Sequence, residues 1–157
     1  GESYNSIAKS EGEIGERWGD GGAEIVAVRV LDRDGNERTA HESGRPLSIE
    51  ISVDSHLPVA DPVVGIRITD VHGSVVWGSS TRRAAFDINR LNGPTTVLYE
   101  IPQLAVLEGT YEITVALADR SETHVYDHWE RKVRFNVHQR SSFDEGIVAL
   151  AGSWRIK

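Results

Sequence analysis

The segment "LSIEISVD" (residues 47–54) decides the fold. Leu47, Ile49 and Ile51, followed by Val53, alternate with polar side chains. Because successive side chains of a β-strand point to opposite faces, this alternation predicts a strand with one buried and one solvated face. Helical periodicity is weak throughout, and residues 84–91 are expected to form a single helical turn at most.

Other strand-like segments flank this one and are separated by turn sequences such as "DRDGNE", "SGRP", "NGP" and "LEGT". Eight short strands broken by turns predict an all-β fold, an antiparallel β-sandwich. Besides residues 47–54, strands are expected over residues 23–31, 63–70, 74–80, 95–101, 110–119, 128–137 and 146–156.

Strand parity predicts which side chains face the core. In the first strand, Val26, Val28 and Val30 should share one side. Trp129 has the parity of Phe135 and is expected to point inward, whereas parity leaves the side of Trp77 open.

Composition narrows the classes of function. The chain has 157 residues, which suits one domain with a real core. Its net charge of −7 disfavours binding to a nucleic-acid backbone, which requires clustered lysine and arginine. The absence of cysteine excludes disulfides and thiolate metal sites, and no apolar run is long enough to span a bilayer.

The glycine-rich start of the first strand is not a nucleotide site. In "RWGDGGAE" (residues 17–24), Glu24 stands where a dinucleotide fingerprint needs its third glycine, and no Walker sequence occurs in the chain. Trp18 and the glycines are instead expected to close one end of the sandwich and lead into the first strand.

No motif indicates catalysis or a metal site. Asp34-Gly35 is typical of a tight turn, and His124 and His128 are interpreted as solvent-facing polar residues without a recognisable ligand set. There is no Gly-x-Ser-x-Gly sequence, and a cluster of acidic residues is expected by chance in a chain with 24 of them. We therefore expect no enzyme, no metal and no cofactor.

Several blocks resemble one family along nearly the whole chain. They are "RWGDGGAEIVAVRVLDRDGNE", "SGRPLSIEISV", "DPVVGIRITDVHGSVVWGSST", "VLYEIPQLAVLEGTYEITVALAD", "YDHWERKVRFNV" and "GIVALAGSW". Together they resemble the C-terminal carbohydrate-binding domain of Wzt-type ATP-binding subunits, which belong to ABC transporters that export O-antigen polysaccharides. In "GSST" (residues 78–81), Ser80 stands where the family commonly has asparagine.

The resemblance implies an immunoglobulin-like sandwich that forms a homodimer by exchanging its C-terminal strand. It implies recognition of the modified non-reducing end of an O-antigen polysaccharide by a concave sheet. The location implied is the cytoplasm, at the inner face of the inner membrane, beside a membrane permease. Residues 1–16 would then be a linker from an absent ATPase domain, and residues 17–157 the carbohydrate-binding domain. The alternative is a dimerisation or assembly domain that binds no glycan.

The resemblance also suggests where a glycan would bind. A sugar site needs an aromatic plate flanked by short polar and charged side chains. The residues expected to line or border it are Arg67, Trp77, Thr81, Asp119 and Tyr126.

The last segment supports the implied strand exchange. Residues 146–156 are largely apolar on both sides, which is expected of a strand buried between partners and unusual for an exposed edge. The alternative is that this strand folds back onto its own sandwich.

Overall fold

The computed structural model describes residues 5–6, 15–141 and 143–157. Within them every regular element is a strand, which confirms the predicted all-β fold. The strands are β1 (Asn5–Ser6), β2 (Arg17–Gly19), β3 (Glu24–Leu31), β4 (Ala40–Glu42), β5 (Leu47–Asp54), β6 (Val59–Ala60), β7 (Val63–Asp70), β8 (Val75–Ser80), β9 (Arg90–Leu91), β10 (Thr95–Ile101), β11 (Gly109–Ala118) and β12 (Val125–His138).

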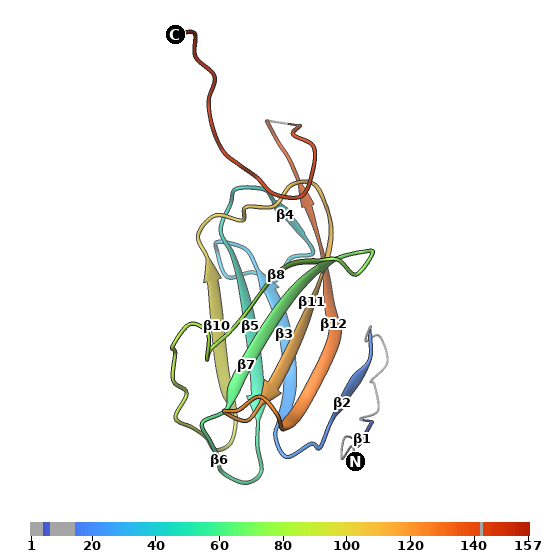
Figure 1. Cartoon of the computed structure of the whole chain (residues 1–157), viewed down its shortest axis with the longest axis vertical. Helices are drawn as coiled ribbons and strands as arrows, with labels where there is room; N and C mark the ends of the chain where they lie inside the picture. The colour runs from blue at the N-terminus through green and yellow to red at the C-terminus, as the bar shows by residue number, and fades with distance from the viewer. Residues whose placement is uncertain (1–4, 7–14, 142) are drawn as a thin grey trace.

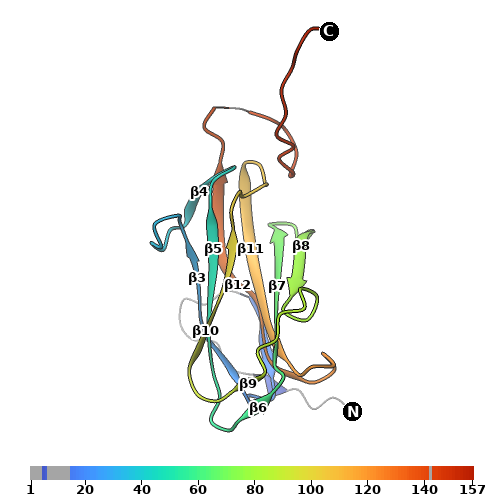
Figure 2. The same cartoon turned by 90° about the vertical axis from the view of Figure 1, so that its left-hand side faces the viewer.

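Two sheets form the sandwich (Figures 1 and 2). The larger sheet has the order β1-β2-β12-β11-β7-β8, with β4 parallel to the end of β12, and the smaller has the order β10-β5-β3. The short strands β6 and β9 pair separately. Among the described residues, the edge strands β8 and β10 therefore each carry one unpaired backbone edge at one side of the sandwich.

The core lies between the sheets. In β5, Leu47, Ile49 and Ile51 are no more than 1% exposed, as the alternation predicts. They pack in one cluster with Trp129 and Phe135 of β12, so Trp129 points inward as expected.

Three local predictions are wrong. A bulge in β3 between Ile25 and Ala27 shifts the parity, so that Val26 is 58% exposed and Ile25 takes the buried place. Residues 84–91 contain no helical turn: the hydrogen bond from the Phe86 N–H to the Thr81 carbonyl (2.8 Å) spans five residues and closes a wider, non-helical turn at their start.

The third error concerns residues 146–156, which are not a strand in this chain. Val148 forms an isolated bridge with Val106, and the backbone then leaves the sandwich (Figure 1). A strand requires a neighbouring edge for its hydrogen bonds, and within the described residues no backbone hydrogen bond beyond Ala149 supplies one.

A buried ion pair closes the side of the sandwich opposite β8 and β10. Asp127 of β12 is fully buried and accepts hydrogen bonds from the Arg17 guanidinium of β2 (2.7 and 3.0 Å) and the Ile25 amide of β3 (2.8 Å). The guanidinium also lies 3.9 Å from the centre of the Trp129 ring. This contact ties both sheets together at one edge.

Candidate functional site

The outer face of the larger sheet carries a depression of about 350 Å³, which we call the outer hollow. It lies over the neighbouring strands β7, β8, β11 and β12. Small residues form part of its floor: Gly65, Gly78 and Ala116. The other lining residues are Ile66, Arg67, Val75, Ser79, Ser80, Arg83, Thr114, Glu122 and His128.

The outer hollow is rich in charged donors. Arg67 projects from β7, and Arg83 lies in the turn after β8, where its amide donates to the Ser80 hydroxyl (3.1 Å). Neither guanidinium forms an ion pair within the described residues, whereas the Glu122 carboxylate is held by Arg82 at 3.0 Å. The hollow therefore presents two available guanidinium groups and one carboxylate that is already paired.

An aromatic stack adjoins the outer hollow. The Trp18 ring of β2 lies 3.7 Å from the His128 ring at 17°, nearly parallel. Burial, and secondarily the positive charge of Arg67, lower the pKa of His128 to about 4, so the imidazole is neutral at pH 7. His128 lies on the outer face of the sheet, as expected, but it is only partly exposed because Trp18 stacks on it.

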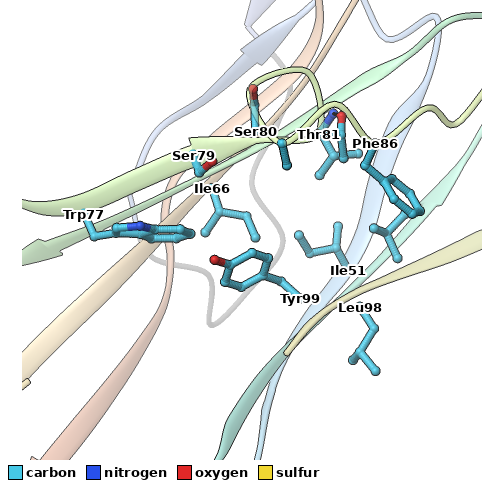
Figure 3. Close-up of a pocket in the computed structure, with 12 residues that line it drawn as sticks. Ile51, Ile66, Trp77, Ser79, Ser80, Thr81, Phe86, Leu98 and Tyr99 are labelled. Atoms are coloured by element: carbon cyan, nitrogen blue, oxygen red, sulfur yellow. Dashed lines mark hydrogen bonds between the residues drawn. The ribbon is translucent and has the colours of Figure 1, made fainter. Parts of the chain in front are cut away.

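A second depression, the edge groove, lies between the unpaired edges of β8 and β10 and measures about 290 Å³ (Figure 3). Trp77 of β8 meets Tyr99 of β10 with ring centres 5.1 Å apart. The groove is mainly apolar, lined by Ile51, Val64, Ile66, Trp77, Ser79, Ser80, Thr81, Ala84, Phe86, Val97, Leu98 and Tyr99.

Thr81 has a structural contact within this groove. Its hydroxyl accepts the Val64 amide at 3.1 Å, and its own amide donates to the Val64 carbonyl at 2.9 Å. These bonds extend the pairing of β7 and β8 by one residue.

Asp119 and Tyr126 line neither depression and lie around the turn between β11 and β12, the turn that contributes Glu122 to the outer hollow. Burial disfavours the charged carboxylate of Asp119, but hydrogen bonds from the His124 amide and the Ser121 hydroxyl outweigh it and lower its pKa. Burial, and then the negative charges of Asp119 and Asp20, raise the pKa of Tyr126. The His124 ring contacts the Asp20 carboxylate.

The five residues expected from sequence thus occupy three places. Trp77 and Thr81 share the edge groove, Arg67 lies in the outer hollow, and Asp119 and Tyr126 border the β11–β12 turn. Sequence reasoning did not select Arg83, Glu122 or the Trp18–His128 stack. Only the pairing of His128 with Trp18, 110 residues apart, could have indicated that stack.

Within the described residues there is no group of three or more histidine, aspartate or glutamate side chains that could hold a metal ion. The same part of the chain contains no helix long and apolar enough to cross a membrane.

The fold and surface define an antiparallel β-sandwich domain with a polar hollow on one sheet and an apolar groove at one edge. Residues 15–150 match the family model described as the Wzt C-terminal domain, so the chain belongs to that family. As a Wzt C-terminal domain, it is a module associated with an ABC transporter family.

A solved structure has the same fold. The crystal structure of the C-terminal domain of Wzt superposes with a TM-score of 0.80 at 18% identity, covering 94% of this chain and 90% of that one. A CARDB domain from Pyrococcus furiosus reaches a TM-score of only 0.44 at 12% identity, over 74% of this chain and 95% of its own. No curated protein sequence matches the chain.

Proposed function

We propose that this domain binds the non-reducing end of an O-antigen polysaccharide in the outer hollow, as the glycan-reading module of an ABC transporter. The observation that carries the proposal is a hollow on one sheet face that combines a floor of small residues, hydroxyl and guanidinium donors and an adjacent aromatic stack.

The physical basis is the mixed polarity of sugars. A pyranose ring has an apolar face of C–H groups and a rim of hydroxyls that need hydrogen-bond partners. Gly65 and Gly78 let a ring approach the backbone of β7 and β8, while Ser80 and Thr114 contribute short polar side chains. Such a surface holds a sugar without large rearrangement.

The lining residues favour binding over hydrolysis. Hydrolysis of a glycosidic bond generally uses two carboxyl groups across the bond. Of the residues lining the hollow, Glu122 is the single carboxylate, and Arg82 holds it. We therefore propose a non-catalytic role that requires no cofactor in this domain.

Calorimetric titration with the cognate polysaccharide, compared with the same polymer lacking its terminal modification, tests the function. Gly65→Ala tests whether the outer hollow is the binding site. Its new methyl group would occupy part of the hollow, yet would lie 3.8 Å or more from its nearest protein neighbours and so would not disturb the fold. We expect about tenfold weaker binding, equivalent to roughly 1.4 kcal/mol, with the fold intact. Unchanged binding by Gly65→Ala would place the glycan elsewhere.

The edge groove supports a homodimer as the second part of the proposal. The C-terminal segment exposes Leu150 (85%), Trp154 (103%) and Ile156 (102%), while the groove leaves Phe86 59% exposed. Burying the apolar side chains of the C-terminal segment against those of the groove lowers the free energy of the dimer. A partner's residues 147–156 would add to the unpaired edge of β8 or β10 and cover the groove, an exchange that costs little.

This segment also distinguishes glycan binding from the alternative, an assembly domain without a ligand. We expect the intact chain to be a dimer by light scattering, and a chain shortened by residues 146–157 to be monomeric or to aggregate. An intact chain that remains monomeric at high concentration contradicts the exchange. A shortened monomer that still binds polysaccharide separates binding from assembly.

In the transporter, the domain would act beside an ATPase domain and a membrane permease, in the cytoplasm at the inner face of the inner membrane. No nucleic-acid partner is proposed, since the net charge is −7. Co-purification tests that placement. The full-length subunit should co-purify with its permease, and the complex should be lost when the ATPase domain is removed but not when this domain is removed.

A further inference from the structure

The charges in the outer hollow narrow the class of glycan. Eight arginines form ion pairs with carboxylates within the described residues: Arg17, Arg29, Arg38, Arg45, Arg82, Arg131, Arg134 and Arg140. Arg67 and Arg83 form none in that part of the chain, although both line the same hollow. The hollow is therefore lined by two arginines that form no ion pair with a carboxylate within the described residues.

The one acidic side chain of the hollow does not offset them. Glu122 lies 3.0 Å from Arg82, so the two charges largely cancel each other. Arg67 and Arg83 then leave this surface positive, although the whole chain has a net charge of −7. A local positive site binds a small anionic group even on a protein of negative net charge, because salt screens the repulsion from distant carboxylates.

The backbone places the two arginines at neighbouring positions of the hollow. Arg67 lies on β7 opposite Gly78 of β8, and the turn bond from the Arg83 amide to Ser80 places Arg83 just beyond the end of β8. The absence of side chains at Gly65 and Gly78 leaves the space between them open. Planar guanidinium groups form paired hydrogen bonds with carboxylate, phosphate or sulfate oxygens.

The positive charge of Arg67 also acts on His128, which lines the same hollow. Burial is the main cause of the low pKa of His128, and the charge of Arg67 is the second cause. His128 therefore stays neutral near pH 7 and adds no third positive charge.

We infer that the outer hollow recognises an acidic group, a carboxylate or a phosphate or sulfate ester, on the sugar unit that it binds. This inference rests on the proposed glycan function and goes beyond it by naming the ligand's charge. Arg67 and Arg83 are the groups that read it.

Amide chemical shifts of the ¹⁵N-labelled domain test the inference with matched probes: mannose against mannose 6-phosphate, glucose against glucuronic acid, and inorganic phosphate alone. The acidic sugars should shift the amides of Gly65, Gly78 and Thr114 at lower concentration than their neutral counterparts. Binding should weaken as salt is added. Arg67→Gln and Arg83→Gln should each weaken binding of the acidic sugars about tenfold.

Arg33→Gln is the control, because Arg33 is an exposed arginine in the turn after β3, away from the hollow. It should leave binding unchanged, and Arg67→Lys should restore part of the affinity lost in Arg67→Gln.

The outcomes separate the two proposals. Equal shifts by neutral and acidic sugars, insensitive to both arginine variants, would overturn the acidic specificity and leave glycan binding standing. Phosphate binding as tight as mannose 6-phosphate would show an anion site that ignores the sugar, against the glycan function. No shift of these amides by any probe counts against both.

Discussion

Asp127→Ala should be among the most damaging single substitutions in the domain. The Asp127 carboxylate is 0% exposed and Arg17 only 10%, and the carboxylate accepts three hydrogen bonds from two other strands. Its removal takes away the buried carboxylate beside the guanidinium over Trp129 and the side-chain acceptor of the Ile25 amide.

The size of the effect follows from this burial. Removing one partner of a buried ion pair costs about 3–5 kcal/mol, because the other charge stays desolvated. For a domain of this size each kcal/mol lowers Tm by roughly 2–4 °C, so the expected loss is about 6–20 °C. Urea unfolding followed by tryptophan fluorescence measures the free energy of unfolding, and calorimetry measures Tm.

The exposed pair Arg29–Glu50 provides the control. Both side chains reach solvent (43% and 25%), so Arg29→Gln should cost no more than about 1 kcal/mol. The double variant Arg17→Met/Asp127→Leu should be less damaged than the sum of its singles, because no unpaired charge remains. If Asp127→Ala costs no more than Arg29→Gln, the buried pair does not hold this edge of the sandwich.

Two further predictions concern stability. Gly19→Ala should prevent folding or lower Tm strongly, because the new Cβ would lie 2.3 Å from the Tyr126 carbonyl oxygen and the backbone φ is +142°. Gly65→Ala should leave Tm nearly unchanged, and equal Tm values for the two variants would contradict this steric reasoning. His128 has a folded pKa of about 4 against the ordinary 6.5, so the unfolded chain takes up its proton first and stability should fall as pH drops from about 6.5 towards 4. His128→Gln should flatten that part of the curve of unfolding free energy against pH, and the exposed His56→Gln should not; identical slopes would show that His128 is not the group responsible.

The strands could be predicted from sequence because each sheet has one face in the core. Leu47, Ile49 and Ile51 show the resulting period of two, and β5 begins and ends where the alternation does. The bulge beside Val26 could not be predicted, since it inserts a residue without any change in composition. The C-terminal segment was assigned as a strand from its apolar residues alone, and apolarity does not supply a partner edge.

The candidate site was harder to predict because it depends on which strands are neighbours. Arg67 was selected from its own strand, but Arg83 joins it only because β7 pairs with β8 and the Ser80 hydroxyl holds the turn that follows. Trp77 illustrates the same limit, since a bulge between β7 and β8 sets its side and directs it towards Tyr99. Alternation describes one strand at a time, whereas register relates different strands.

The two depressions suit different partners because their chemistry differs. Trp77, Phe86 and Tyr99 give the edge groove an apolar surface between two unpaired backbone edges, which favours another apolar strand over a hydrated sugar. The centre of the outer hollow lies over β7 and β11, whose backbones are paired on both sides, so ligand contacts there come mainly from side chains. The two depressions share Ile66, Ser79 and Ser80, so a partner strand added to the edge of β8 would border the outer hollow, and we expect assembly at the edge to influence glycan binding.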